Sequence, residues 1–169
     1  MRALSLPLIL GGLLLASAAG HAGEQVAGER VFGSWTVECS ALDVGGKCAM
    51  TQRVATDPEG KKVILGVIVE GSEGDTRYQV IFRLSPNIYV AAGAGMKIDD
   101  HDAKRAPISA CDKKVCEVRA WLTPELLGEM RDGKLLVFAF FTPEKKQVSV
   151  PVSLAGFGAA YDELGKRLQ

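Results

Sequence analysis

The residue types best suited to catalysis gather in the segment Asp99-Asp100-His101-Asp102. Carboxylates and an imidazole can bind a metal ion, and paired carboxylates can hydrolyse a glycosidic bond. His101 is the only histidine after residue 22, so a mechanism with a histidine base would have to use it. However, adjacent residues of an extended loop point in different directions, and the interleaved oxygen ligands of a calcium loop are missing. We interpret the segment as a solvated acidic loop and predict no catalytic residue and no metal ligand.

A second segment, Gly128-Glu-Met-Arg-Asp-Gly133-Lys134, matches the start of a phosphate-binding loop. The next position is Leu135, where the motif needs a hydroxyl to bind magnesium, and the expected helix precedes the segment instead of following it. Gly93-Ala-Gly95 lacks the third glycine of a dinucleotide-binding loop. We therefore predict no nucleotide site and no cofactor.

Four cysteines are the other reactive side chains, and they allow three pairings. We favour Cys39 with Cys48 and Cys111 with Cys116, because each pair brackets a polar loop between two strand-like segments. Long-range pairing stays open as an alternative. A thiolate metal site and a redox-active pair are both disfavoured, because the sequence contains no Cys-x-x-Cys.

Most of the chain shows the pattern of short strands. Trp35, Val37 and Cys39 alternate with polar residues, which predicts a strand with Trp35 anchored in the core. The apolar, β-branched run at 63–69 predicts a strand buried on both faces. Pro151 cannot donate a backbone hydrogen bond, so that end of the last strand is expected at a sheet edge or leaving the sheet. Further strands are expected at 48–54, 78–84, 88–90, 96–99, 116–122, 135–141 and 148–154.

Two short helices complete the pattern. Thr123 can cap a helix that begins with Pro124, and Gly133 ends it. A last helix within 156–164 should dock Phe157 and Leu164. Many short strands at close spacing, with only two brief helices, predict an all-β sandwich and not alternating βαβ units.

The first 22 residues have the organisation of a secretory signal peptide. Met1-Arg2 is positively charged, residues 4–15 are apolar, and small residues offer cleavage points between Ala18 and Ala22. The apolar run is too short to cross a bilayer, which takes ~20 residues, and no later uncharged segment is longer. We therefore expect no transmembrane segment in the mature form. Residues 23–29 form a flexible lead-in, and residues 30–169 form one domain.

The composition predicts no general affinity for nucleic acid. The chain has 20 basic and 20 acidic residues, and removing residues 1–22 takes away one basic residue, Arg2. Three lysine doublets, at 61–62, 113–114 and 145–146, fall at predicted turns. We interpret them as solubilising residues, with a basic rim for anionic partners as the alternative. Trp121 points outward, where the following helix covers it or where it serves as an interface anchor.

Several segments together resemble the invasion-associated locus B family of exported bacterial proteins. They are the signal peptide, the stretch 32–39, the stretch 48–52, the loop at 111–116 and the closing stretch 150–160. The resemblance implies an immunoglobulin-like β-sandwich in the periplasm of a Gram-negative bacterium, at its surface, or secreted from it. Pathogenic members of the family are associated with invasion of host cells. The resemblance brings no catalytic residues with it.

We therefore expect a non-enzymatic protein of the bacterial envelope that binds another protein or an envelope component. The sequence does not indicate which residues bind. Two rival hypotheses stay open. One is a small periplasmic hydrolase that uses Asp99, Asp100 or Asp102, and the other is a stabiliser or chaperone of envelope proteins.

Overall fold

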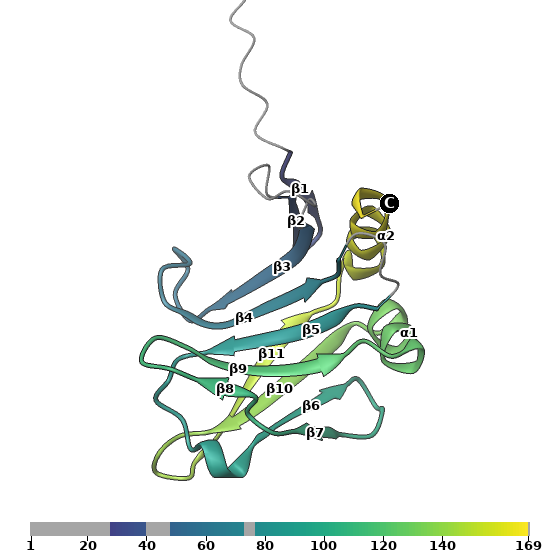
Figure 1. Ribbon diagram of the computed structural model, residues 1–169. Coiled ribbons are helices and arrows are strands. Elements are labelled where there is room, and N and C mark those ends of the chain that lie inside the picture. The colour runs from purple at the N-terminus through teal and green to yellow at the C-terminus, as the bar shows by residue number, and fades with distance from the viewer. Residues whose placement is uncertain (1–27, 40–47, 73–76, 169) are drawn as a thin grey trace, which may run out of the picture.

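The computed structural model describes residues 28–39, 48–72 and 77–168 (Figure 1). The strands are β1 (Arg30–Phe32), β2 (Trp35–Cys39), β3 (Cys48–Ala55), β4 (Val63–Glu70), β5 (Gln79–Leu84), β6 (Ala94–Ile98), β7 (Lys104–Ala106), β8 (Ala110–Cys111), β9 (Cys116–Trp121), β10 (Leu135–Phe141) and β11 (Gln147–Ser153). The helices are the 3₁₀ turn η1 (Val90–Ala92), α1 (Pro124–Asp132) and α2 (Phe157–Arg167). The expected signal peptide and most of the lead-in lie outside the described residues.

The strands form two antiparallel sheets that pack face to face. The larger sheet has the order β1-β2-β3-β4-β5-β9-β8, and the smaller has the order β11-β10-β6-β7. Phe82 of the larger sheet stacks on Phe138 of the smaller, with ring centroids 4.3 Å apart, at the centre of the shared core. The all-β sandwich with two short helices that the sequence predicts is confirmed. Pro151 lies in β11, an edge strand, as expected.

Both α-helices lie at the same end of the sandwich (Figure 1). α1 begins where the sequence predicts it, because the backbone N–H of Leu126 donates to Thr123 Oγ1 at 3.2 Å and Pro124 occupies the first turn. α2 packs against β1, β2 and β3 and buries Phe157 and Leu164. The last helix thus closes one end of the core, as its apolar residues predict.

The turn between β1 and β2 packs directly against the turn between β11 and α2. The N–H of Ser34 donates to the carbonyl oxygen of Ala155 at 3.0 Å. Gly33 and Gly156 have φ values of +58° and +87°, which favour glycine. A Cβ on Gly156 would lie 2.0 Å from the carbonyl oxygen of Phe32. This contact requires glycine and joins two segments that are distant in the sequence.

Two buried side chains, Trp35 and Gln52, form hydrogen bonds beside the contact between these two turns. Trp35 Nε1 donates to the carbonyl oxygen of Ser153 at 3.1 Å, and the ring meets Phe157 edge to face with centroids 5.2 Å apart. Gln52 interrupts the apolar pattern of β3 but still points inward. Its Nε2 donates to the carbonyl oxygens of Ser34 and Ser153 at 3.1 and 3.2 Å. The amide therefore connects the two sheets.

Two disulfides close two hairpins of the larger sheet. Cys39 is joined to Cys48 at the end of the β2–β3 hairpin, and Cys111 is joined to Cys116 across β8 and β9. Each disulfide links residues that are paired in the sheet. Each also stabilises the fold by restricting the conformations of the unfolded chain. The loop between Cys39 and Cys48 lies outside the described residues.

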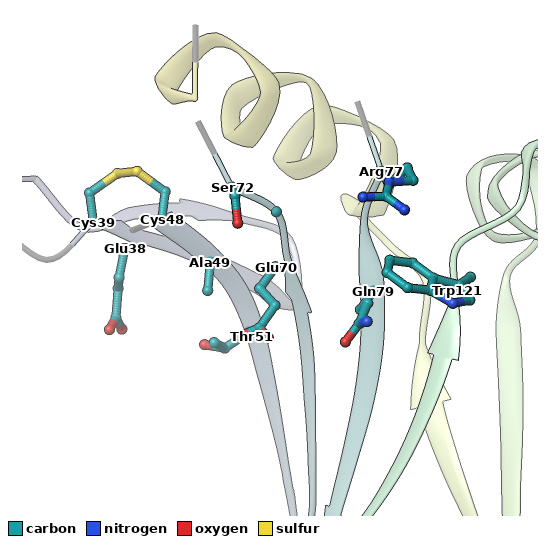
Figure 2. Close-up of a pocket in the computed structure, with 11 residues that line it drawn as sticks. Glu38, Cys39, Cys48, Ala49, Thr51, Glu70, Ser72, Arg77, Gln79 and Trp121 are labelled. Carbon is teal, nitrogen blue, oxygen red and sulfur yellow. A yellow bond between two sulfur atoms is a disulfide. The ribbon is translucent and has the colours of Figure 1, made fainter. Parts of the chain in front are cut away.

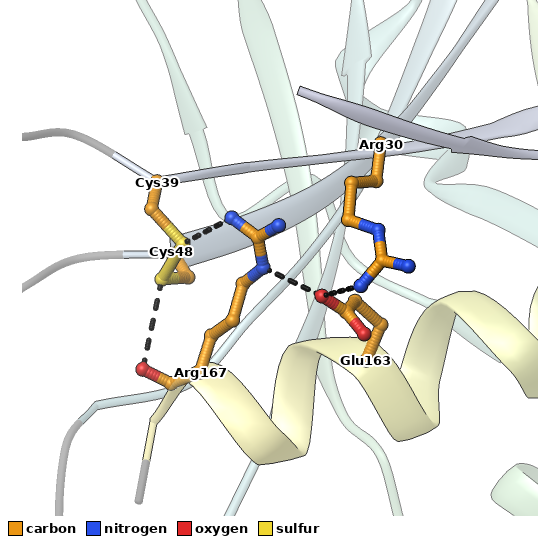
Figure 3. Close-up of a disulfide and its surroundings, with 5 residues drawn as sticks. All are labelled: Arg30, Cys39, Cys48, Glu163 and Arg167. Atoms are coloured by element: carbon orange, nitrogen blue, oxygen red, sulfur yellow. Dashed lines mark hydrogen bonds and ion pairs between the residues drawn. A yellow bond between two sulfur atoms is a disulfide. The ribbon is translucent and has the colours of Figure 1, made fainter. Parts of the chain in front are cut away.

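The first disulfide is held against α2 by a small ion-pair network (Figure 3). Arg167 Nη1 donates to the Sγ atom of Cys39 at 3.5 Å. Arg167 Nε and Arg30 Nη1 both donate to Glu163 Oε1, each at 2.8 Å. Hydrogen bonds from Arg167 and Arg30 hold the pKa of the Glu163 carboxyl below its usual value. The network joins β1, the β2–β3 hairpin and α2.

This network predicts a stability loss in acid. Because the folded-state pKa of Glu163 is depressed, its stabilisation is present above the unfolded-state value and disappears as the pH falls through the folded-state value. We expect the free energy of unfolding to fall less steeply below pH ~5 for Glu163→Gln than for the wild type. Urea titrations of both proteins at several pH values measure this. Parallel pH profiles would show that the carboxylate contributes nothing.

The structure corrects two details of the sequence-based prediction. β4 is not buried on both faces, because Ile64, Gly66 and Ile68 lie on the side of the sheet away from the core and are partly exposed. Within the described residues, no second layer covers that side. The segment 88–90, expected to be a strand, leads into η1 instead.

Candidate binding surface

The side of the larger sheet that points away from the core forms an open surface, here called the outer face. The strand register places its side chains in rows that run across the sheet. One row is Glu38, Ala49, Glu70, Gln79 and Trp121. The next rows are Thr36, Thr51, Ile68, Ile81 and Arg119, and then Arg53, Gly66, Arg83 and Glu117. Ile81 is fully buried, so it is not part of the accessible surface. The outer face therefore combines charged, polar and aliphatic groups in a fixed arrangement.

The first row borders a hollow of about 580 Å³, here called the Trp121 hollow (Figure 2). Its lining includes two carboxylates, an amide, a hydroxyl and an indole. These groups belong to Glu38, Glu70, Gln79, Thr51 and Trp121. Donors and acceptors beside an aromatic ring offer a partner both directional and apolar contacts.

Trp121 is 54% exposed, so the prediction that the following helix covers it is wrong. α1 directs Leu126 and Met130 into the core and leaves the indole at the surface. The guanidinium carbon of Arg77 lies 5.3 Å from the ring centroid. The other interpretation of Trp121, an interface anchor, is compatible with a ring that is exposed and that Arg77 contacts.

A second hollow, of about 510 Å³, continues along β4 and is here called the Gly66 hollow. It shares Glu38 and Thr51 with the Trp121 hollow. Its other lining residues include three cations, Arg53, Arg83 and Lys114, and three aliphatic residues, Val63, Ile64 and Ile68. The outer face thus changes along the strands from carboxylates near Trp121 to cations near Gly66.

Ion pairs hold the side chains of the outer face in place. Glu117 accepts hydrogen bonds from Arg83 Nε at 2.8 Å and from Arg119 Nη2 at 2.6 Å. Partial burial raises the pKa of Glu117, but the hydrogen bonds from Arg119 and Arg83 outweigh it and keep the pKa below its usual value. Arg119 Nη1 also lies 3.8 Å from Glu70 Oε1. A partner would therefore meet a surface whose charges are already positioned.

Within the acidic segment 99–102, Asp99 has a structural role. The Asp99 carboxylate accepts the backbone N–H groups of Lys134 and Leu135 at 2.8 and 3.0 Å, so it closes the turn between α1 and β10. His101 Nδ1 lies 3.9 Å from Glu129 Oε1. Across residues 28–39, 48–72 and 77–168, no three His, Cys, Asp or Glu side chains gather in a way that could hold a metal ion.

The three lysine doublets lie in turns at one end of the sandwich, opposite the α-helices (Figure 1). Asp57 and Asp112 lie in two of these turns and accept backbone N–H groups there. Lys145 Nζ lies 5.3 Å from the centroid of the Tyr89 ring. Because neighbouring carboxylates offset part of the charge, this end is a weaker binding candidate than the outer face.

The sequence model of the Invasion associated locus B (IalB) protein family matches residues 35–165. The chain belongs to this family. The matched region contains both disulfides and every row of the outer face described above. No curated protein sequence matches the chain significantly. In the described part of this family member, no helix is long and apolar enough to cross a bilayer.

The fold is similar to the crystal structure of invasion associated protein B from Bartonella henselae. The TM-score is 0.71 with 19% sequence identity, and the match covers 82% of this chain and 95% of that chain. At this identity the likeness establishes the fold. Together with the family match, it confirms the resemblance noted from the sequence.

The outer face cannot be recognised from the local sequence pattern. Arg53 and Arg83 were visible as polar positions in alternating strands, and Gly66 as a break in an apolar run. The register that places Gly66 between the two arginines depends on β3, β4 and β5 being neighbours, which the local pattern does not show.

Proposed function

We propose that this family member is an exported protein of a Gram-negative envelope, in the periplasm or at the cell surface, that binds another protein and catalyses no reaction. Binding takes place on the outer face. One observation carries the proposal: Trp121 is half-exposed, supported by Arg77, and beside a polar hollow on an uncovered sheet face of the described chain. Tryptophan and arginine are enriched among the residues that dominate binding energy.

Three carboxylates of the described chain, Glu117, Glu163 and Asp99, have structural roles, which favours binding over catalysis. A general acid at neutral pH needs a raised pKa, whereas the pKa values of Glu117 and Glu163 are both lowered by arginines. The Asp99 carboxylate accepts hydrogen bonds from two backbone N–H groups in a turn. These groups have structural roles that catalysis would disrupt.

Export is supported by two features. Residues 1–22 have the pattern of a signal peptide, and two disulfides suit an oxidising compartment such as the periplasm. The names of the family and of the Bartonella structure both refer to invasion. We therefore propose contact with host cells as the biological setting in pathogenic relatives.

Site-specific photo-crosslinking in living cells, followed by fractionation, tests this function. A photoreactive amino acid replaces Thr51, which lines both hollows, and the matched control replaces Ser149, an exposed residue of the smaller sheet. We expect one partner protein to be captured through position 51 and not through position 149. Capture through position 149 alone would overturn the proposal, as would an absence of capture together with substrate turnover by the purified protein.

Trp121→Ala is expected to weaken binding of the captured partner by about 30- to 700-fold, the range for loss of an interface hot spot. The exposed side chain adds little to the core, so the free energy of unfolding should change by less than about 1 kcal/mol. Titration calorimetry measures the affinity, and thermal melting controls for folding. Trp121→Phe should keep part of the affinity. A change below threefold for Trp121→Ala would place the binding site elsewhere.

A further inference from the structure

Gly66 lies at the centre of the outer face, in the middle strand of the larger sheet. It pairs in regular register with Arg53 of β3 and Arg83 of β5. The register shift between β3 and β4 occurs at Val54 and Ala55, so Gly66 does not form a bulge. A glycine here leaves bare backbone where the pattern of the sheet provides space for a side chain.

The fold itself does not require this glycine. Gly33 and Gly156 have positive φ and no room for a Cβ, but Gly66 is not among the residues with positive φ. A Cβ added to Gly66 would meet only the Cβ of Arg83, at an ordinary contact distance of 3.7 Å. A glycine inside a strand lowers stability and often marks a place where a ligand or another backbone approaches closely.

The bare backbone lies among cations. Arg53 and Arg83 flank Gly66 across the sheet, and Lys114 lines the same hollow. Two carboxylates face these three cations: Glu38, which lines the hollow, and Glu117, which pairs with Arg83. Arg83 pairs with Glu117 through its Nε, and its side chain is still 50% exposed, so its guanidinium can be reached by a ligand. Guanidinium groups bind carboxylates through paired hydrogen bonds. The charge of the Gly66 hollow therefore suits an acidic ligand.

The floor of the hollow is aliphatic. Ile64 and Ile68 lie on either side of Gly66 in β4, are partly exposed and line the hollow with Val63, which is 44% exposed. An acidic sugar or a phosphate would leave these apolar surfaces exposed to water. A polypeptide strand presents carboxylates and aliphatic side chains together, so the lining favours a polypeptide.

We propose that the Gly66 hollow receives an extended, acidic segment of the partner protein. The backbone of the segment passes over Gly66, its carboxylates bind Arg53 and Arg83, and its aliphatic side chains pack on Ile64 and Ile68. This inference rests on the proposed function and adds to it the chemistry of the partner segment.

An NMR titration of the isotope-labelled mature protein tests the chemistry. The probes are an octapeptide of alternating glutamate and valine, its glutamine counterpart, and a galacturonic acid trimer. We expect the glutamate peptide alone to shift the amide signals of Gly66, Arg53 and Arg83, and to do so less as salt is added. A stronger response to the galacturonic acid trimer would mean that the hollow binds an acidic glycan and not a polypeptide. No response at Gly66 would overturn the site.

Substitution of Gly66 shows whether the glycine serves binding or the stability of the fold. Gly66→Val is expected to weaken peptide binding at least tenfold, while the Tm stays the same or rises by about 1–4 °C. Gly128→Ala in α1 is the matched control, since nothing lies within 4 Å of its added Cβ. It should also raise the Tm and should leave binding unchanged. Gly66→Ala, which adds a single methyl group, serves as the second variant if valine disturbs the sheet.

Crosslinking with the same variants distinguishes this inference from the proposed function. If Gly66→Val and Arg53→Glu both reduce capture through position 51, the acidic segment is supported. If neither variant reduces capture but Trp121→Ala abolishes it, the outer face binds its partner in another way and only this inference fails. If none of the three reduces capture, both proposals fail.

Discussion

Gly156→Ala is expected to destabilise the protein by about 3–5 kcal/mol, because two costs add. The φ of +87° is unfavourable for any residue with a Cβ, and the added Cβ would lie 2.0 Å from the carbonyl oxygen of Phe32. The obstacle is backbone, which cannot rotate away as a side chain can. Relief would require separating the β1–β2 turn from the β11–α2 turn and breaking the hydrogen bond from Ser34 to Ala155.

Gly60→Ala provides the matched control for this prediction. Gly60 has a φ of +70°, close to that of Gly156, but nothing lies within 4 Å of its added Cβ. Gly60→Ala should therefore lower the free energy of unfolding only by the cost of the positive φ, about 1–2 kcal/mol. Urea denaturation of the two variants and the wild type measures the difference. Equal losses would mean that the close contact with Phe32 adds no cost, and that the β1–β2 turn and the β11–α2 turn can separate easily.

Trp35→Ala is the second substitution with a large expected effect, a loss of about 3–5 kcal/mol. The side chain is fully buried, meets Phe157 edge to face and donates to the carbonyl oxygen of Ser153. Its removal would leave a cavity between β2, β11 and α2 and an acceptor with one partner fewer. Denaturant unfolding gives the magnitude.

Two further variants test the assignment of roles to the tryptophans. Trp35→Phe should fall between the wild type and Trp35→Ala, because it keeps much of the packing but loses the indole N–H. Trp121→Ala should change the stability far less than Trp35→Ala, since Trp121 is exposed. If the two alanine variants were equally destabilised, Trp121 would be a structural residue and not a binding one.

Much of the fold could be predicted from local signals. The alternation from Trp35 to Cys39 identified an amphipathic strand, and Thr123 with Pro124 identified the start of α1. These predictions succeeded because each depends on residues that are neighbours in the sequence. The family resemblance brought together segments 32–39 and 150–160, and the contact of Gly33 and Gly156 with each other's turns gives a physical reason for their association.

Other features depend on partners that the local sequence does not name. Gln52 appeared to interrupt a buried strand, but it is buried because carbonyl groups of Ser34 and Ser153 reach it from distant segments. The strand at 63–69 seemed buried on both faces because it is almost entirely apolar. Whether a second layer covers each face depends on the packing of whole sheets. For the same reason the outer face cannot be predicted from any single strand.

Quenching of tryptophan fluorescence tests whether the partner binds to the outer face. The chain has two tryptophans, and only Trp121 is accessible, because Trp35 is fully buried. Acrylamide should therefore quench Trp121 and spare Trp35 in the free protein. We predict that the partner captured through position 51 protects Trp121 from acrylamide at saturating concentration. Unchanged quenching in the complex would contradict binding at the outer face, since the partner would then occupy a different surface.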